Sequence, residues 1–196
     1  MYNFNFYMPT KVLFGPGRLQ DLHKGQLPGK KALIVTSNGS SVKRFGYLDA
    51  VKKELDLAGI GYEVFDQVRP NPTDYNVMDG AKMARDTGCD FVVALGGGSV
   101  MDCCKAVSLA AVYDGDVWTD FWAKAGVIDV KPISLGIIMT VSGTGSEMNG
   151  GAVITNEALK IKTGRDYPAL NAQFALLDPL YTYTVPKLQM ISGCLP

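Results

Sequence analysis

The sequence predicts an α/β fold of Rossmann-like architecture, with a mainly parallel sheet flanked by helices. Three observations lead to this fold class. Short apolar runs alternate with amphipathic segments about every 25 to 30 residues, a spacing typical of β-α-β units. Several of these runs end in loops rich in glycine, serine or proline. One run, Phe91–Leu95, passes directly through Gly96-Gly97-Gly98-Ser99 into a segment with helical periodicity.

Composition and charge exclude several classes of protein. The 196 residues are 47% hydrophobic and 19% charged, which is ordinary for a globular chain able to bury a core. The 19 Lys and Arg balance the 19 Asp and Glu, so no excess of positive charge favours the binding of nucleic acid. No apolar run reaches about 18 residues, and the first residues lack the pattern of a signal peptide. We therefore expect a cytoplasmic protein without nucleic-acid or membrane partners.

The elements before residue 90 follow from local patterns. Three apolar runs are predicted strands: Lys11–Phe14, Lys31–Thr36 and Tyr62–Phe65. Three helices should accompany them: a brief one through Leu19 and Leu22 that ends near Gly25, one from Tyr47 to Ala58, and one that Thr73 or Asp74 caps and that runs to Thr87. Gly15-Pro16-Gly17 should stop the first strand, and Gly88 should close the third helix.

The second half of the chain continues this alternation. Four further strands are predicted: Phe91–Leu95, Ile133–Met139, Ala152–Thr155 and Gln173–Asp178. The helix after the glycines should place on one face Val100, Cys104, Val107 and Ala111. The polar stretch 156–170 is interpreted as a turn-rich connection, and the aromatic cluster 118–122 as core or interface. Pro186 should begin a last helix whose apolar stripe contains Leu188, Ile191 and Leu195.

The glycine turn indicates a phosphate site. Three successive residues without Cβ atoms let a ligand approach the backbone, and the following helix directs its free N–H groups and positive dipole end there. The alternative is a plain tight turn with Ser99 as the helix cap. The loops 37–41, 70–74 and 96–99 all follow strands, so they should converge at the carboxyl edge of the sheet. Neither glycine-rich loop matches the G-x-G-x-x-G or P-loop patterns.

Several motifs together resemble one family, the iron-containing (group III) alcohol dehydrogenases, particularly their butanol dehydrogenase branch. The matching segments occur in the family's order over essentially the whole chain: Pro9–Lys11, Phe14–Gly17, Pro70–Thr73, Gly96–Ser99 with Asp102 and Lys105, Thr140–Glu147, Ala175–Pro179 and Thr184–Pro186. The resemblance implies a dehydroquinate-synthase-like fold. Residues 1–185 would then form the dinucleotide-binding domain, and residues 186–196 would start a helical metal-binding domain whose remainder is absent from these residues.

The resemblance also implies a site for a nicotinamide cofactor. Backbone N–H groups of the glycine turn would hold the diphosphate, and the hydroxyls of Thr140, Ser142 and Thr144 would surround the ribose and nicotinamide. The full set of expected cofactor-binding residues is Ser37, Gly39, Ser40, Ser41, Lys43, Asn71, Gly97, Gly98, Ser99, Asp102, Thr140, Ser142, Thr144 and Lys162. None of these is assigned a role in the chemical step.

Asn71, Lys162 and Asp102 of this set each also fit a structural role. Asn71 would lie near the adenosine half of the cofactor, but it also suits an Asx turn between its two prolines. Lys162 would reach the ribose region, but it lies in a charged stretch typical of a solvated surface. Asp102 follows Ser99 by three residues, the spacing of a capping box with Asp in place of Glu.

The loop after the second strand bears on the choice of cofactor. NAD-specific members of the family place an aspartate where this chain has Ser37, and Lys43 and Arg44 follow shortly. Small hydrogen-bond donors with nearby cations suit a 2′-phosphate, which is almost doubly charged. The sequence therefore predicts NADP(H) in preference to NAD(H). The alternative is that Lys43 and Arg44 are ordinary solvated charges.

The family's metal site has no counterpart in these residues. Family members transfer hydride at a divalent iron or zinc ion held by one aspartate and three histidines. Cys194 follows the matching Ser192-Gly193 step, and His23 is the single histidine. We therefore expect no metal binding by this chain and no turnover of a small alcohol or aldehyde by it alone. We also expect self-association through the face that the family's metal-binding domain would cover.

Two other functions compete with an alcohol dehydrogenase domain. One is a nucleotide-binding module of the same superfamily without catalysis, which the missing metal ligands favour. The other is a lyase or glycerol-phosphate dehydrogenase of that superfamily, against which the Thr140–Glu147 stretch argues. The four cysteines form no C-x-x-C pair and are expected to be reduced thiols.

Overall fold

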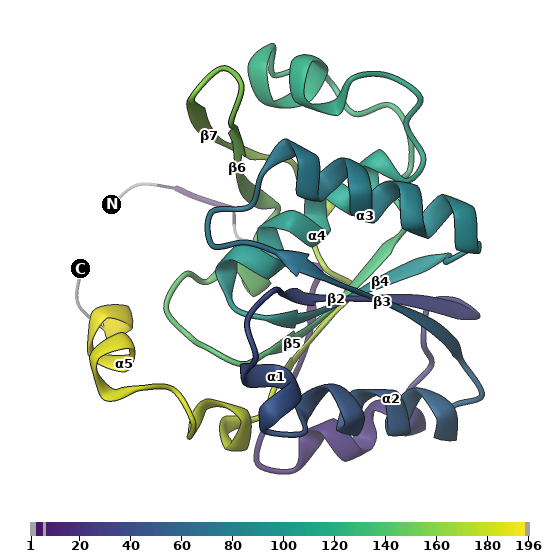
Figure 1. Ribbon diagram of the computed structural model, residues 1–196, viewed down its shortest axis with the longest axis vertical. Coiled ribbons are helices and arrows are strands. Elements are labelled where there is room, and N and C mark those ends of the chain that lie inside the picture. Colours follow the sequence, from purple (N-terminus) through teal and green to yellow (C-terminus); the bar gives the residue numbers. More distant parts are fainter. Residues whose placement is uncertain (1–2, 6, 195–196) are drawn as a thin grey trace.

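A parallel sheet of six strands forms the centre of the molecule, as the sequence predicts (Figure 1). The computed structural model describes residues 3–5 and 7–194. The sheet has the order β1-β8-β5-β4-β2-β3. Its strands are β1 (Lys11–Phe14), β2 (Lys31–Ser37), β3 (Gly61–Val68), β4 (Phe91–Gly96), β5 (Ser134–Met139) and β8 (Phe174–Leu177).

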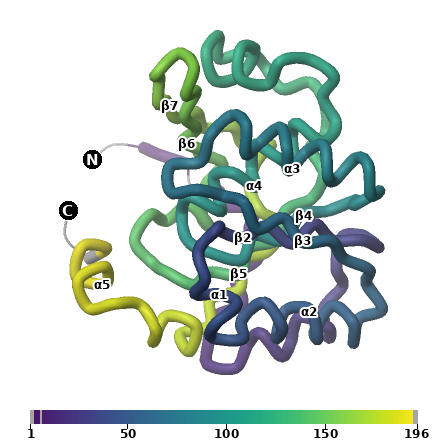
Figure 2. Tube along the Cα trace, viewed as in Figure 1, coloured from purple at the N-terminus to yellow at the C-terminus, as the bar shows by residue number. Residues whose placement is uncertain are grey.

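Helices cover both faces of this sheet. The α-helices are α1 (Ser41–Arg44), α2 (Tyr47–Leu57), α3 (Asp74–Thr87), α4 (Gly98–Ala110) and α5 (Lys187–Cys194). Four short 3-10 helices connect them: η1 (Arg18–Lys24), η3 (Ser146–Met148), η4 (Pro168–Leu170) and η5 (Pro179–Thr182). Helices α3 and α4 lie on one face, and α2 with η1 lies on the other (Figures 1 and 2).

The central strand β4 shows why both faces are closed. Its side chains alternate between two cores, with Val92 and Ala94 facing α3 and α4, and Phe91, Val93 and Leu95 facing α2 and η1. All of them are fully buried. A continuous apolar run is therefore what this position in a parallel sheet requires.

Helix α3 begins and ends where the sequence predicts. The Thr73 hydroxyl accepts a hydrogen bond from the Asn76 amide at 3.2 Å, and the Asn76 side chain accepts one from the Thr73 amide at 3.4 Å. This reciprocal capping box uses Asn in place of Glu or Gln. Gly88 closes the helix with φ +69°, a left-handed conformation that favours glycine.

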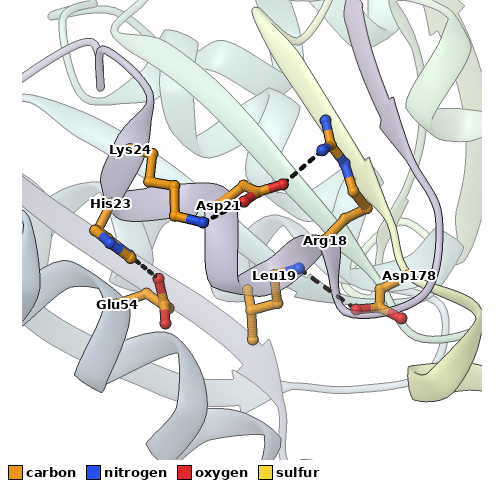
Figure 3. A network of polar contacts seen from close by, with 7 residues as sticks. All are labelled: Arg18, Leu19, Asp21, His23, Lys24, Glu54 and Asp178. Atoms are coloured by element: carbon orange, nitrogen blue, oxygen red, sulfur yellow. Dashed lines mark hydrogen bonds and ion pairs between the residues drawn. The ribbon is translucent and has the colours of Figure 1, made fainter.

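Polar contacts attach η1 to the rest of the fold (Figure 3). His23 Nδ1 lies 2.6 Å from the buried Glu54 carboxylate of α2, and the Leu19 amide donates to Asp178 at 3.4 Å. The Asp178 carboxylate also caps η5 by accepting from the Leu180 amide at 3.0 Å. The single histidine and Asp178 thus hold elements of the fold together.

The stretch 156–170 differs from the prediction of a turn-rich connection. It contains strand β7 (Ile161–Asp166), which pairs antiparallel with β6 (Gly151–Asn156) outside the main sheet. Every residue of β7 is exposed or half-exposed, so no buried face gives this strand an apolar signature. Its partner β6 packs Ala152 and Ile154 into the core beside α4.

The aromatic cluster after α4 belongs to the core. Trp118, Phe121 and Trp122 are buried in a turn of π-helix, η2 (Trp118–Ala123). The Trp122 Nε1 donates to the Ala152 carbonyl oxygen at 3.0 Å, which joins η2 to β6. The core alternative that the sequence offered for this cluster is therefore correct.

The last helix, α5, begins at Lys187, directly after Pro186. Leu188 and Ile191 of its predicted stripe are 76% and 45% exposed, while Leu195 lies outside the described residues. The stripe therefore has no apolar cover from the described part of the chain. A division of the chain at residues 185 and 186 stays a prediction. None of the described helices is long and apolar enough to cross a bilayer.

Candidate cofactor site

The topology of the sheet creates a crevice at its carboxyl edge. Strands β2 and β4 are neighbours, but the chain leaves β2 toward β3 at one edge and leaves β4 toward β5 in the opposite direction. Connections that diverge in this way leave an opening between them, and ligands of open α/β sheets bind there. The loops after β2 and β4 are the two that flank this opening.

The glycine turn after β4 leads directly into helix α4. Gly97 occupies the N-cap position, helical geometry begins at Gly98, and no described side chain caps the helix. The alternative in which Ser99 caps the helix is therefore wrong, because Ser99 already lies inside the first turn. The amides of Gly98 and Ser99 have no acceptor within the helix, so they suit an anion at this point.

Two residues distant in sequence meet Ser99 at this turn. The Asn71 amide donates to Ser99 Oγ at 3.3 Å, and Lys162 Nζ donates to Asn71 Oδ1 at 2.7 Å. Asn71 has φ +56°, a left-handed conformation that asparagine adopts more readily than most residues. The structure thus places together three expected cofactor residues from α4, the loop after β3, and β7.

The segment after β5 lies against the same glycine turn. The Thr140 amide donates to the Gly96 carbonyl oxygen at 3.0 Å. Thr144 packs on Gly98 so closely that a Cβ there would lie 2.7 Å from the Thr144 Cγ2. Ser142 is exposed, and its carbonyl oxygen faces Gly193 of α5. Thr140 and Thr144 therefore border the turn, while Ser142 lies nearer to α5.

Asp102 does not form a capping box, because the helix N-cap is Gly97 and not Ser99. Its carboxylate accepts from Ser146 Oγ at 2.7 Å and from the Val153 amide at 3.0 Å. Asp102 therefore joins helix α4 to the segment that leads into β6. Its expected contact with a cofactor stays a prediction.

The loop after β2 carries the residues expected to select the cofactor. Ser37 ends β2, Gly39 and Ser40 are exposed, and Ser41 begins the short helix α1, which the sequence analysis missed. A cavity of about 90 Å³ lies between this region and the Thr140 segment. Its lining includes Ser41, Tyr47, Thr140, Val141 and Tyr181.

The two basic residues near this loop already have partners. Lys43 forms an ion pair with Asp66 of β3, and the hydrogen bond from Lys43 lowers the pKa of the Asp66 carboxyl. The Arg44 guanidinium lies 4.6 Å from the centre of the Phe45 ring, a cation–π contact. Asp66 is a residue of this site that the sequence analysis missed. The only sequence signal for Asp66 was its position directly after the predicted strand Tyr62–Phe65.

The described residues do not fit the family's metal. Within residues 3–5 and 7–194, no three His, Cys, Asp or Glu side chains gather as metal ligands. His23 lies on η1 in contact with Glu54. No chemical step through a metal is therefore assigned to these residues.

Comparisons with known proteins agree with this geometry. Residues 9–179 match the family "Iron-containing alcohol dehydrogenase". The chain is 40% identical over 193 residues to "Probable NADH-dependent butanol dehydrogenase 1" of Bacillus subtilis, covering 98% of this chain and 49% of that protein. It is 38% identical to the NADPH-dependent aldehyde reductase YqhD of Escherichia coli, again covering 98% and 49%. The chain thus spans about half the length of these relatives.

A solved structure extends the comparison to three dimensions. The NADH-dependent butanol dehydrogenase A of Thermotoga maritima superposes with a TM-score of 0.89 at 36% identity, over 98% of this chain and 48% of that one. The family match covers most of the chain, and the fold agrees with it. By sequence and by fold, the chain belongs to the iron-containing alcohol dehydrogenase family.

Proposed function

We propose that this chain is the cofactor-binding part of a metal-dependent alcohol dehydrogenase that interconverts small alcohols and their aldehydes or ketones. The convergence of Asn71, Ser99 and Lys162 beside an uncapped helix N-terminus carries this proposal. Backbone amides without an acceptor in the helix, a hydroxyl and a cation lie together there, and this combination suits a phosphate at the crevice of an open parallel sheet. A nicotinamide dinucleotide, when bound, supplies the group that accepts or donates hydride.

The residues present fit such a cofactor. The amides of Gly98 and Ser99 would hold its diphosphate, and Lys162 would add a positive charge nearby. Thr140 and Thr144 would contribute hydroxyls on the other side of the turn. Each group binds or orients the cofactor, so the described residues contribute affinity and geometry to the reaction.

We further propose a preference for NADP(H) over NAD(H). Serine replaces a carboxylate at the end of β2, so Ser37 does not repel a 2′-phosphate there. The ion pair between Lys43 and Asp66 weakens this argument, because the pairing satisfies the cation and adds a negative charge. Known relatives include NADH-dependent and NADPH-dependent enzymes. The serine at position 37, in place of a carboxylate, is the observation that supports this preference.

Titration of the purified chain with NADPH and NADH tests both proposals. Cofactor fluorescence reports binding, and each titration is repeated with zinc or ferrous iron. We expect saturable binding of both cofactors, a lower Kd for NADPH, and no effect of either metal. Equal Kd values would overturn the NADP(H) preference alone. Absence of saturable binding of either cofactor would contradict the cofactor-binding function itself.

A further inference from the structure

Lys105 is a lysine with no solvent exposure, inside helix α4. Lysine is almost never fully buried without partners, and Lys105 has four. Its Nζ donates to the carbonyl oxygens of Ser146 and Gly151, each at 2.7 Å, to Ser146 Oγ at 2.8 Å, and to Asn149 Oδ1 at 3.1 Å. All four acceptors belong to the segment 146–151, which lies between the Thr140 loop and β6.

The contacts of Lys105 continue through Ser146 and return to the same helix. Ser146 Oγ donates to Asp102 at 2.7 Å, and Asp102 also accepts from the Val153 amide of β6 at 3.0 Å. Lys105 and Asp102 therefore hold the segment 146–153 from two points on α4, three residues apart. We call Lys105, Asp102, Ser146 and Asn149 the buried clamp.

The buried clamp is connected to the candidate cofactor site. The Ser146 amide donates to Thr144 Oγ1 at 3.3 Å, and Thr144 is the residue that packs on Gly98. Three members of the clamp also line an open hollow of about 430 Å³ together with Thr144. A displacement of Ser146 would therefore move Thr144 away from the glycine turn.

We propose that Lys105 is a positioning residue of the cofactor site. From inside the fold it holds the segment 144–151 on α4, so that Thr144 stays against Gly98 and the crevice keeps its shape for the cofactor. Lys105 itself lies under the segment and touches no cofactor. This inference rests on the proposed cofactor-binding function.

The protonation state of Lys105 gives the inference a second consequence. Charged or titratable groups of three elements influence its pKa: Asp102 and Cys104 of α4, Glu147 of η3 and Asp166 of β7. Burial lowers the pKa of Lys105 to about 8 despite the nearby carboxylates. The neutral amine has two N–H donors for four acceptors, whereas the ammonium has three. Cofactor affinity should therefore decrease as the pH rises above about 8.

The test measures the NADPH Kd of the purified chain at pH 7 and pH 9 in the wild type and in Lys105→Met. If only the ammonium form binds well, the wild-type Kd should rise up to about tenfold between these pH values. Lys105→Met should raise the Kd at pH 7 by about tenfold or more and remove the dependence of the Kd on pH. If Lys105 had only a structural role, the wild-type Kd would not change between pH 7 and pH 9. Lys124→Met is the matched control, because Lys124 is exposed and paired only with Asp120 among the described residues.

A second readout does not depend on the cofactor. Amide hydrogen exchange of residues 144–151 should be faster in Lys105→Met than in the wild type, with α2 unchanged. If Lys105→Met does not fold, Ser146→Ala, which removes one acceptor, should show the same two changes to a smaller extent. Unchanged exchange and an unchanged Kd in a folded variant would overturn the role of Lys105. Absence of cofactor binding by the wild type would contradict the proposed function. The amide hydrogen exchange of residues 144–151 would still show whether Lys105 holds this segment.

Discussion

At the scale of single residues, the ammonium group of Lys43 is paired with the Asp66 carboxylate of β3. The sequence predicted an available cation beside Ser37, because the two basic residues follow the loop directly. Asp66 comes from the neighbouring strand, 23 residues further along the chain. Its contact with Lys43 depends on how β2 and β3 pair, and their register shifts between Val35 and Ser37. Local sequence does not contain that information.

The same pair yields a prediction about cofactor preference. Asp66→Asn should release Lys43 and remove a negative charge, so NADPH binding should strengthen relative to NADH. An interaction of about 1 kcal/mol between such partly exposed charges corresponds to about a fivefold change in the ratio of the two Kd values. Fluorescence titration measures that ratio. Asp49→Asn makes the same charge change at an exposed position of α2 and should leave the ratio unaltered. An unaltered ratio in Asp66→Asn would show that no 2′-phosphate lies near Lys43.

At the scale of elements, the predictable parts are those with a local physical cause. A helix cap at Thr73 or Asp74, the closing residue Gly88 and the apolar run of β4 were all predicted, because caps, turns and apolar runs are properties of neighbouring residues. Strand β7 was missed because its stability comes from pairing with β6. The short helix α1 was missed because four residues are too few to show periodicity.

Helix α3 offers a test of this local control. Thr73 is buried, and Thr73→Ala removes the hydroxyl that accepts a hydrogen bond from the Asn76 amide. Loss of such a cap costs about 1 to 2 kcal/mol, so the free energy of unfolding in urea should fall by that amount. Thr73→Ser keeps the oxygen and should lose clearly less. Equal losses in the two variants would mean that the methyl group, and not the cap, stabilises this helix start.

At the scale of the whole molecule, the order of the strands in the sheet determines which local motifs lie close together. The glycine turn, the Ser37 loop and the Asn71 loop were each predicted as ends of strands, and their convergence follows from parallel pairing. The buried clamp was not predicted, although Lys105 and Asp102 were recognised as motif residues. Its acceptors lie more than 40 residues away from Lys105, and only the packing of β6 on α4 brings them there.

Because helix α4 is buried, its titratable side chains should make the free energy of unfolding of the whole molecule depend on pH. Burial raises the pKa of both Cys103 and Cys104 above the ordinary value of 9.0. Above about pH 9 the unfolded chain therefore loses protons that the folded chain keeps, and each thiol lowers the free energy of unfolding by about 1 kcal/mol from pH 9 to pH 10. Their stabilising contribution is complete below this pH. Lys105 acts in the opposite direction, because its pKa is lowered from 10.5 to about 8, so its contribution rises between these values.

The two thiols of α4 should together lower the free energy of unfolding by about 2 kcal/mol from pH 9 to pH 10 in the wild type. Urea unfolding in the presence of a reductant measures this change. Replacing both thiols, in Cys103→Ala/Cys104→Ala, should leave the contributions of Lys105 and of other shifted groups such as Cys89, so the change over this interval should differ from that of the wild type by about 2 kcal/mol. The comparison uses the pH slope and not the absolute stability, because truncation of buried side chains also lowers the latter. Equal slopes in the two proteins would mean that the thiols of α4 become accessible and ionise without global unfolding, which the packing of this helix against the sheet does not permit.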